Sequence, residues 1–225
     1  MALCMRYAAD AIATLIMLSR MRLPSLTVAR AEFSIEDPWA LPPNCEPIQL
    51  LRSTDGKQPR QATTVAMYTD PQFLNVLYQS QDDEVVATFL GHDEPLYQED
   101  VVEAFLAPGD IRRYYEIEVN PLGTTFDARV DSPDGVRGTM KIDVGWNADL
   151  FAAIRRQPDK TETIVRIPFA ALDARRPAAG EEWRGNFFRV DRSKWRGDEY
   201  SAWSPTLKNP ADFHVAAVFG RIVFA

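Results

Sequence analysis

The sequence predicts an all-β fold, an antiparallel β-sandwich of jelly-roll type with about ten strands. Three observations point to this fold. After residue 32 apolar residues recur with a period of two, candidate strands follow one another every ten to fifteen residues, and Pro, Gly, Asn and Asp separate them. Many short strands with turn residues between them are typical of sandwiches and barrels. Apart from a short turn in "PFAALDA", no segment has the 3.6-residue period of a helix.

The expected strands are rich in β-branched and aromatic residues. Turn chemistry separates them at "TDP", "APGD", "NPLG" and "SPDG". In chain order the predicted strands are residues 63–69, 73–80, 84–90, 100–107, 114–120, 124–131, 138–144, 162–169, 185–192 and 220–225.

The strand "YYEIEVN" shows how these strands would pack. Side chains alternate between the two faces of a strand, so Tyr115, Ile117 and Val119 share one face and can enter the core. The other face carries Tyr114, Glu116, Glu118 and Asn120. We therefore expect one face of each sheet, together with the loops at its ends, to be free for function.

Composition restricts the function. The 225 residues, 46% hydrophobic and 25% charged, fit one folded domain. A net charge of −7 argues against a nucleic-acid binder or a polybasic membrane-surface protein. Cys4 and Cys45 form no CxxC motif, which excludes a zinc site built on cysteine. His92 and His214 are the only histidines, so a His-based metal site or a Ser–His–Asp triad is poorly supplied.

Residues 1–31 differ from the rest, since they hold four arginines and a single acid. The apolar run "AIATLIML" has the length of a signal-peptide core and is too short to span a bilayer, and "ARA" at 29–31 is typical of a signal cleavage site. Against export, Arg20 and Arg22 interrupt the run, and an internal Met could be the true start. The predicted domain is 32–225. It would be secreted or periplasmic with a signal peptide, and cytoplasmic with a mis-assigned start.

Aromatic and charged residues gather in two places, "LYQEDVVEAF" and residues 183–220. A pyranose offers an apolar C–H face that stacks on an aromatic ring, and its hydroxyls bond to carboxylates, Arg and Asn. Aromatic residues in loops beside such polar groups therefore indicate a sugar site.

Six blocks resemble, in this order, the pattern of family 9-like carbohydrate-binding modules, and together they cover about residues 60–225. They are "LYQEDVVEAFLAPG", "YYEIEVNPLGTTFDARV", "VRIPFAAL", "WRGNFFRVDR", "YSAWSPT" and "FHVAAVFGRIVF". The resemblance implies a β-sandwich that binds, without cleaving, plant-polysaccharide-type sugars such as cellulose and xylan chains at their reducing ends. Such modules support polysaccharide breakdown and are often attached to glycoside hydrolases, so a hydrolase acting in trans is an expected partner.

The resemblance also implies the site residues. Two tryptophans sandwich the sugar in that family, and their positions match Tyr97 and Phe213 here. Its polar contacts match Glu103 and, with a different spacing, Arg129. Five further residues are candidates for a supporting role: Asp100, Asp127, Arg189, Asp191 and Trp203. For these, structural roles are the favoured interpretation, with Asp100 fixing a loop, Arg189 and Asp191 forming an ion pair, and Trp203 packing in the core.

Other readings stay open. No cofactor and no metal site are expected, although Asp70, Asp82, Asp83 and Glu84 could offer oxygens to a structural calcium ion. A glycoside hydrolase needs two carboxylates across the bond, which Asp100, Glu103, Asp127 and Asp191 could supply. A haem-binding electron-transfer sandwich would need axial ligands, for which Met67 or Met140 could pair with His92 or His214.

Overall fold

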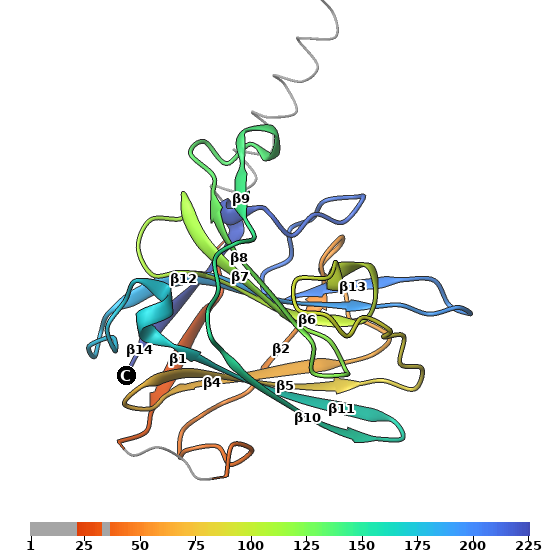
Figure 1. The fold of residues 1–225 in the computed structure, drawn as a ribbon, viewed down its shortest axis with the longest axis horizontal. Helices are drawn as coiled ribbons and strands as arrows, with labels where there is room; N and C mark the ends of the chain where they lie inside the picture. The colour runs from red at the N-terminus through yellow and green to blue at the C-terminus, as the bar shows by residue number, and fades with distance from the viewer. Residues whose placement is uncertain (1–21, 33–36) are drawn as a thin grey trace, which may run out of the picture.

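The computed structural model describes residues 22–32 and 37–225, and this part of the chain is all-β, as predicted (Figure 1). Its strands are β1 (Ser25–Arg30), β2 (Ile48–Gln49), β3 (Leu51–Arg52), β4 (Thr63–Thr69), β5 (Phe73–Gln81), β6 (Val101–Ala107), β7 (Arg113–Val119), β8 (Thr125–Asp131), β9 (Lys141–Asp143), β10 (Phe151–Gln157), β11 (Lys160–Pro168), β12 (Glu182–Asp191), β13 (Glu199–Ala202) and β14 (Gly220–Phe224). Short 3₁₀ turns are η1 (Leu96–Gln98), η2 (Arg137–Thr139), η3 (Phe169–Leu172) and η4 (Ala216–Val218). No helix among the described residues has the length and apolarity to cross a membrane.

The strands form two layers. One layer has the order β1-β14-β12-β6-β7-β8-β9 and the other has the order β10-β11-β5-β4-β1, with β1 common to both. All pairs are antiparallel except those of β1. The main core lies between the layers, and Tyr115, Ile117 and Val119 enter it as the alternation predicted. The sandwich prediction is therefore confirmed (Figure 1).

The folded unit begins before residue 32. Ser25–Arg30 is an interior strand, parallel to β14 on one side and to β4 on the other, and Leu26 and Val28 are buried in the core. The boundary at residues 31/32 therefore needs correction, because a chain beginning at residue 32 would lack the strand that joins the two layers. Residues 1–21, which hold the apolar run and Cys4, lie outside the described residues.

The predicted strand 84–90 is wrong. This segment is extended but pairs with no strand. Its backbone N–H groups bond to carboxylates instead: Val86 donates to Asp100 (2.6 Å), Leu90 donates to Glu94 (2.9 Å), and the N–H of Thr88 donates to Glu99. Side-chain acceptors close in sequence thus replace the ladder. Of residues 138–144, only Lys141–Asp143 is a strand, after the turn η2.

The outer face of β12, β6, β7 and β8 is covered rather than solvated. The connection from β8 to β9 and the segment from β13 to β14 lie on the side of this sheet away from β4 and β5 (Figure 1). Beneath them Phe105, Tyr114, Phe188 and Phe219 form a second apolar cluster. A functional site on this face would therefore be enclosed by loops.

Candidate functional site

Two rows of residues across the sheet form the floor of a pocket on this outer face. Strand register places Phe188 of β12, Glu103 of β6, Glu118 of β7 and Phe126 of β8 side by side. In the next row Glu116 lies opposite Phe105. The period of two points all of these side chains to the same face. The sequence therefore places three glutamates among aromatic rings.

The pocket above this floor has a volume of about 780 Å³. Tyr97 of η1 and Tyr200 of β13 line it, together with Arg137 of η2, Ile142 of β9 and the residues from Lys208 to His214. A cavity of this size holds a ligand of one or a few sugar rings.

The three glutamate carboxyls are close together and buried. One oxygen from each lies within 4.8 Å of the others, and Glu103, Glu116 and Glu118 are 2%, 6% and 0% exposed. Oε1 of Glu103 and both oxygens of Glu118 accept no hydrogen bond from the described residues. Buried polar groups ordinarily have partners, so these oxygens are available to a ligand.

Burial changes the protonation of this cluster. Burial, followed by the charge of Glu116, raises the pKa of Glu103 well above its usual range. Burial, followed by the charges of Glu103 and Glu116, does the same to the pKa of Glu118. Burial also raises the pKa of Glu116 to about 7. The pocket floor therefore retains protons to a higher pH than ordinary carboxyls do.

The two arginines beside the pocket, Arg137 and Arg192, are engaged elsewhere. Arg137 pairs with Asp212 (Nη1 to Oδ1, 2.7 Å). Arg192 donates to the Tyr200 hydroxyl (2.7 Å) and to the backbone carbonyl of Tyr97 (2.7 Å), and it pairs with Asp198. These contacts fix Arg192 along the pocket wall and tie Tyr97 to it.

His214 lies deep in the wall rather than in a solvated loop. Its Nδ1 and the Tyr114 hydroxyl are hydrogen-bonded (2.7 Å), and its Nε2 is 3.8 Å from Oε1 of Glu116. Burial, followed by the charge of Arg137, lowers the pKa of His214 to about 4. The imidazole is therefore neutral at pH 7 and does not balance the charge of Glu116.

The two predicted stacking residues both line the pocket with Glu103. Tyr97 is 51% exposed and lies at the rim. Phe213 stacks on Phe188 with ring centroids 4.2 Å apart and planes 14° apart, so one face of Phe213 is covered by the floor. Tyr200 meets the Phe213 ring edge-on at 6.2 Å. A sugar ring could therefore meet two or three aromatic side chains here.

The structure does not bring Arg129 to this pocket. Arg129 follows Phe126 by three residues on β8, so its side chain leaves the opposite face, where it pairs with Asp143 (2.9 Å). Asp127 shares that face and accepts the N–H of Ala148 (3.3 Å). The sequence-based pairing of Arg129 with Glu103 in one site is therefore not formed.

The other supporting candidates hold the fold together. Arg189 and Asp191 form the expected ion pair (2.7 Å), buried on the core side of β12. Trp203 is 7% exposed and packs on Phe187 with centroids 5.8 Å apart, as the packing interpretation predicted. Of the haem-ligand candidates, Met67 lies in the core between the layers, on the other side of the sheet from the pocket.

Asp100 holds together two backbone segments next to the pocket. Its carboxylate accepts the N–H of Val86 (2.6 Å) and the N–H of Arg192 (2.6 Å), which joins two segments far apart in the chain. Burial, with a smaller contribution from nearby acids, raises its pKa to about 7. The predicted role in fixing a loop is therefore confirmed, and Asp100 is not among the residues lining the pocket.

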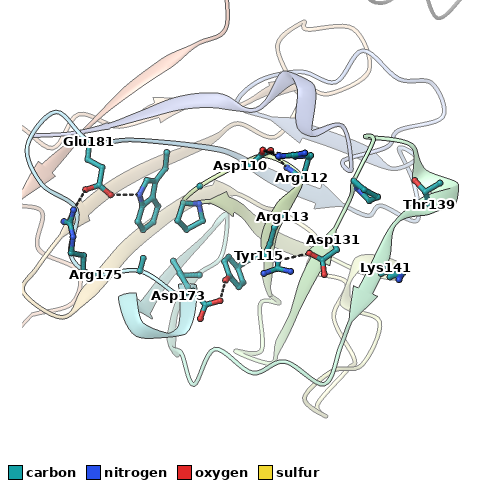
Figure 2. A pocket seen from close by; sticks show the side chains of 16 residues that line it. Asp110, Arg112, Arg113, Tyr115, Asp131, Thr139, Lys141, Asp173, Arg175 and Glu181 are labelled. Carbon is teal, nitrogen blue, oxygen red and sulfur yellow. Dashed lines mark hydrogen bonds and ion pairs between the residues drawn. The ribbon is translucent and has the colours of Figure 1, made fainter.

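A second cavity of about 890 Å³ lies at another part of the molecule (Figure 2). Most of its charged groups are already paired with one another. Arg113 pairs with Asp131 (2.7 Å), Arg175 pairs with Glu181 (3.2 Å), and the Tyr115 hydroxyl donates to Asp173 (2.8 Å). Trp183 in its wall is 1% exposed and offers no open ring face. The first pocket, with its unsatisfied carboxyls and open aromatic rim, is therefore the stronger candidate.

Several residues of the first pocket were not singled out as candidates from the sequence. Glu116 and Glu118 were placed on the correct face of their strand, but nothing assigned them to the site. The sequence feature that could have assigned them is the alternation of Glu116 and Glu118 in β7, the strand next to the strand of Glu103. Phe126, Tyr200 and Arg192 carry no such signal, because loop closure and strand register bring them here.

Comparisons with known proteins identify the family. The family model for carbohydrate-binding family 9 matches residues 48–224. A relative from Arthroderma benhamiae described as an extracellular protein is 26% identical over 191 residues, which cover 79% of this chain and 85% of the relative.

Solved structures share the fold. A crystal structure from Bacteroides uniformis has a TM-score of 0.67 and 19% identity, and the match covers 91% of this chain and 100% of that chain. A family 9 module from Caldicellulosiruptor kristjanssonii, in complex with glucose, has a TM-score of 0.63 and 17% identity over 89% of this chain and 95% of the module. A family 9 module from the same organism, in complex with cellotriose, has a TM-score of 0.61 and 16% identity over 89% of this chain and 93% of the module. The family match covers most of the chain, and the protein belongs to carbohydrate-binding family 9.

Proposed function

We propose that this protein binds carbohydrate, without cleaving it, in the pocket between η1 and the β13–β14 segment. The observation that carries the proposal is the arrangement of the pocket, in which unsatisfied buried carboxyls lie beneath an aromatic rim. The hydroxylated edge of a sugar can bond to the carboxyls, and its apolar face can stack on the aromatic rim.

The depth of the carboxyls suggests how the sugar enters. Glu103 and Glu118 are almost fully buried, whereas Tyr97 is half exposed at the rim. A ring that stacks on Tyr97 and Phe213 would direct one hydroxylated edge to the floor. Such a pocket suits the terminal residue of a chain, and family membership favours the reducing end of cello- or xylo-oligosaccharides.

The setting is proposed by analogy with the relatives. The Arthroderma relative is described as extracellular, which favours export of this chain and an encounter with polysaccharide outside the cell. A glycoside hydrolase acting in trans on the same polysaccharide is the proposed functional partner.

Calorimetric titration tests the proposal. The full chain is titrated with cello-, xylo- and glucosamine-based oligosaccharides, and with the reduced alditols of those that bind. We expect binding of at least one series, lost on reduction, and weakened at least tenfold, about 1.4 kcal/mol, by Tyr97→Ala.

The matched control is Phe151→Ala. Phe151 is a similarly exposed aromatic residue (50%), lies on β10 at the edge of the other layer, and should leave binding unchanged. If none of the oligosaccharides binds, or if Tyr97→Ala binds like the wild type, the pocket is not the proposed sugar site. Binding that survives reduction would remove only the reducing-end assignment.

A hydrolase is the second candidate, because the three carboxyls are about as close as the pair of a retaining glycosidase. However, such a pair needs one ionised nucleophile, and here burial raises the pKa of all three glutamates. Sustained release of nitrophenol from nitrophenyl glycosides, abolished by Glu103→Gln, would favour the enzyme. We expect no release above that of the variant.

A further inference from the structure

The floor of the pocket has more negative groups than the protein balances. Among the described residues no Lys or Arg forms an ion pair with Glu103, Glu116 or Glu118, and the only histidine near them, His214, is neutral at pH 7. Three carboxyls in a buried space are costly unless protons or a cation compensate them. In the absence of ligand, protons do so.

A neutral sugar is an incomplete partner for this floor. Each hydroxyl has one proton to donate, whereas an ammonium group has three donors and a positive charge. Three acceptors from Glu103, Glu116 and Glu118 lie within 4.8 Å of one another, which is the arrangement that one ammonium group can bridge. Charge-assisted hydrogen bonds of this kind are about twice as strong as neutral ones.

The rings around the carboxyls fit the same chemistry. Phe105, Phe126 and Phe213 line the pocket beside the glutamates. Aromatic faces attract a nearby cation and also accept the C–H face of a sugar. The pocket thus combines a site for positive charge with a platform for the ring that carries it.

We propose that the pocket is selective for a sugar that carries an ammonium group, such as a glucosamine residue with a free amine, over the neutral sugar of the same shape. The inference rests on the proposed function, since it names the class of sugar for the same site.

A metal ion is a weaker occupant. Calcium takes six to eight oxygen ligands, and the three glutamates provide the only acidic side chains among the described residues that line the floor. The neighbouring phenylalanines offer no oxygen. An ammonium group needs only the three acceptors, and its sugar uses the rings.

Binding should release protons. An ammonium group beside the carboxyls favours their ionised forms, so protons retained by the empty pocket leave as the ligand enters. The affinity for the amino sugar should therefore rise from pH 5.5 to pH 7.

The other titratable or charged groups that line the pocket or its wall are Tyr97, Tyr114, Arg137, Arg192, Tyr200, Lys208, Asp212 and His214. Asp212 differs from the glutamates because it is already paired with Arg137. His214 stays neutral over this pH range.

The experiment compares three matched trisaccharides on the full chain by calorimetry at pH 7: the glucosamine trimer, cellotriose and the N-acetylglucosamine trimer. We expect the glucosamine trimer to bind at least tenfold more tightly than the other two. Titration in two buffers with different ionisation heats should show proton release for the glucosamine trimer alone.

A matched pair of variants separates the pocket from general attraction to an acidic protein. Glu118→Gln and Glu46→Gln each replace one carboxyl by an amide of the same size, but Glu46 is exposed and lies outside the pocket. Glu118→Gln should remove most of the preference for the amino sugar, whereas Glu46→Gln should keep it.

The outcomes distinguish the two proposals. Cellotriose that binds as tightly as the glucosamine trimer would overturn the inference and leave the proposed function intact. If no trisaccharide binds, the proposed function fails as well. Equal loss of preference in both variants, or displacement of the glucosamine trimer by 1 mM calcium chloride at constant ionic strength, would also overturn the inference.

Discussion

Replacing Glu118 by glutamine should stabilise the protein at neutral pH. Glu118 is 0% exposed, and neither carboxyl oxygen accepts a hydrogen bond from the described residues. Its pKa in the folded state is well above the ordinary value of 4.5, because burial and the charges of Glu103 and Glu116 oppose ionisation. The folded protein therefore keeps this proton to a higher pH than the unfolded chain does.

The magnitude follows from that proton. Each unit by which the folded-state pKa exceeds the ordinary value of 4.5 is worth about 1.4 kcal/mol, so the interval from pH 4.5 to pH 7 limits the cost at pH 7 to at most about 3 kcal/mol. A raised carboxyl pKa gives stability that is fully present below pH 4.5 and is lost as pH rises towards the folded-state value. Glu118→Gln should therefore match the wild type near pH 4.5 and exceed its free energy of unfolding by up to about 3 kcal/mol at pH 7.

Urea unfolding at several values between pH 4.5 and pH 8 measures the difference, with Glu46→Gln as the exposed control. The control should follow the wild type at every pH. If Glu118→Gln is less stable than the wild type at pH 7, or if the difference does not change with pH, Glu118 is not a proton-retaining group and the account of the pocket floor is wrong.

Three further predictions concern the fold and the two histidines. Gly220→Ala should lower the free energy of unfolding by about 1–3 kcal/mol in thermal melts, because a Cβ there would overlap the Trp203 ring. Gly109→Ala is the matched control, since Gly109 also lacks a positive φ but has open space around its Cα. A chain beginning at residue 32 should lose cooperative unfolding in near-ultraviolet circular dichroism, and a truncated chain as stable as the full one would contradict the interior position of β1. In NMR spectra the ring of His214 should not titrate between pH 5.5 and pH 8. The ring of His92 should titrate with a pKa above the usual 6.5, because its hydrogen bond to Asn147 and the charge of Asp93 outweigh partial burial. If His214 titrates in this range and His92 does not, the placement of both rings is wrong.

Most of the sheet could be predicted from the period of two, because strands with one core face carry that pattern in their own residues. Thr63–Thr69 and Thr125–Asp131 illustrate this, since their predicted and observed bounds agree within one residue. The edge strand Phe151–Gln157 was missed because its residues are mostly exposed or half-buried, so the pattern does not alternate clearly. Residues 84–90 have the composition of a strand, but carboxylates outside the segment take their N–H groups, which composition does not show.

The candidate site could be predicted only in part, for a similar reason. Tyr97, Glu103 and Phe213 were found because they belong to recognisable blocks, and the structure brings them to one pocket. Arg129 was misplaced because the choice between the two faces of β8 depends on register with β7, which a single strand does not reveal. The cluster of three glutamates needed that same register, since Glu103 and Glu118 meet across two strands.

The position of β1 has a consequence for how the chain is made. Leu26 of β1 lies beside Ile222 of β14, so two strands far apart in the chain pair, while the other partner of β1, strand β4, follows it much sooner. The two layers can therefore close only after β14 has emerged from the ribosome. Contacts of such large sequence separation slow folding, because a long loop must be ordered before they form. Until β14 has been made, the apolar residues of β1 lack one of their two neighbouring strands, and exposed apolar segments of this kind are where chaperones are most needed.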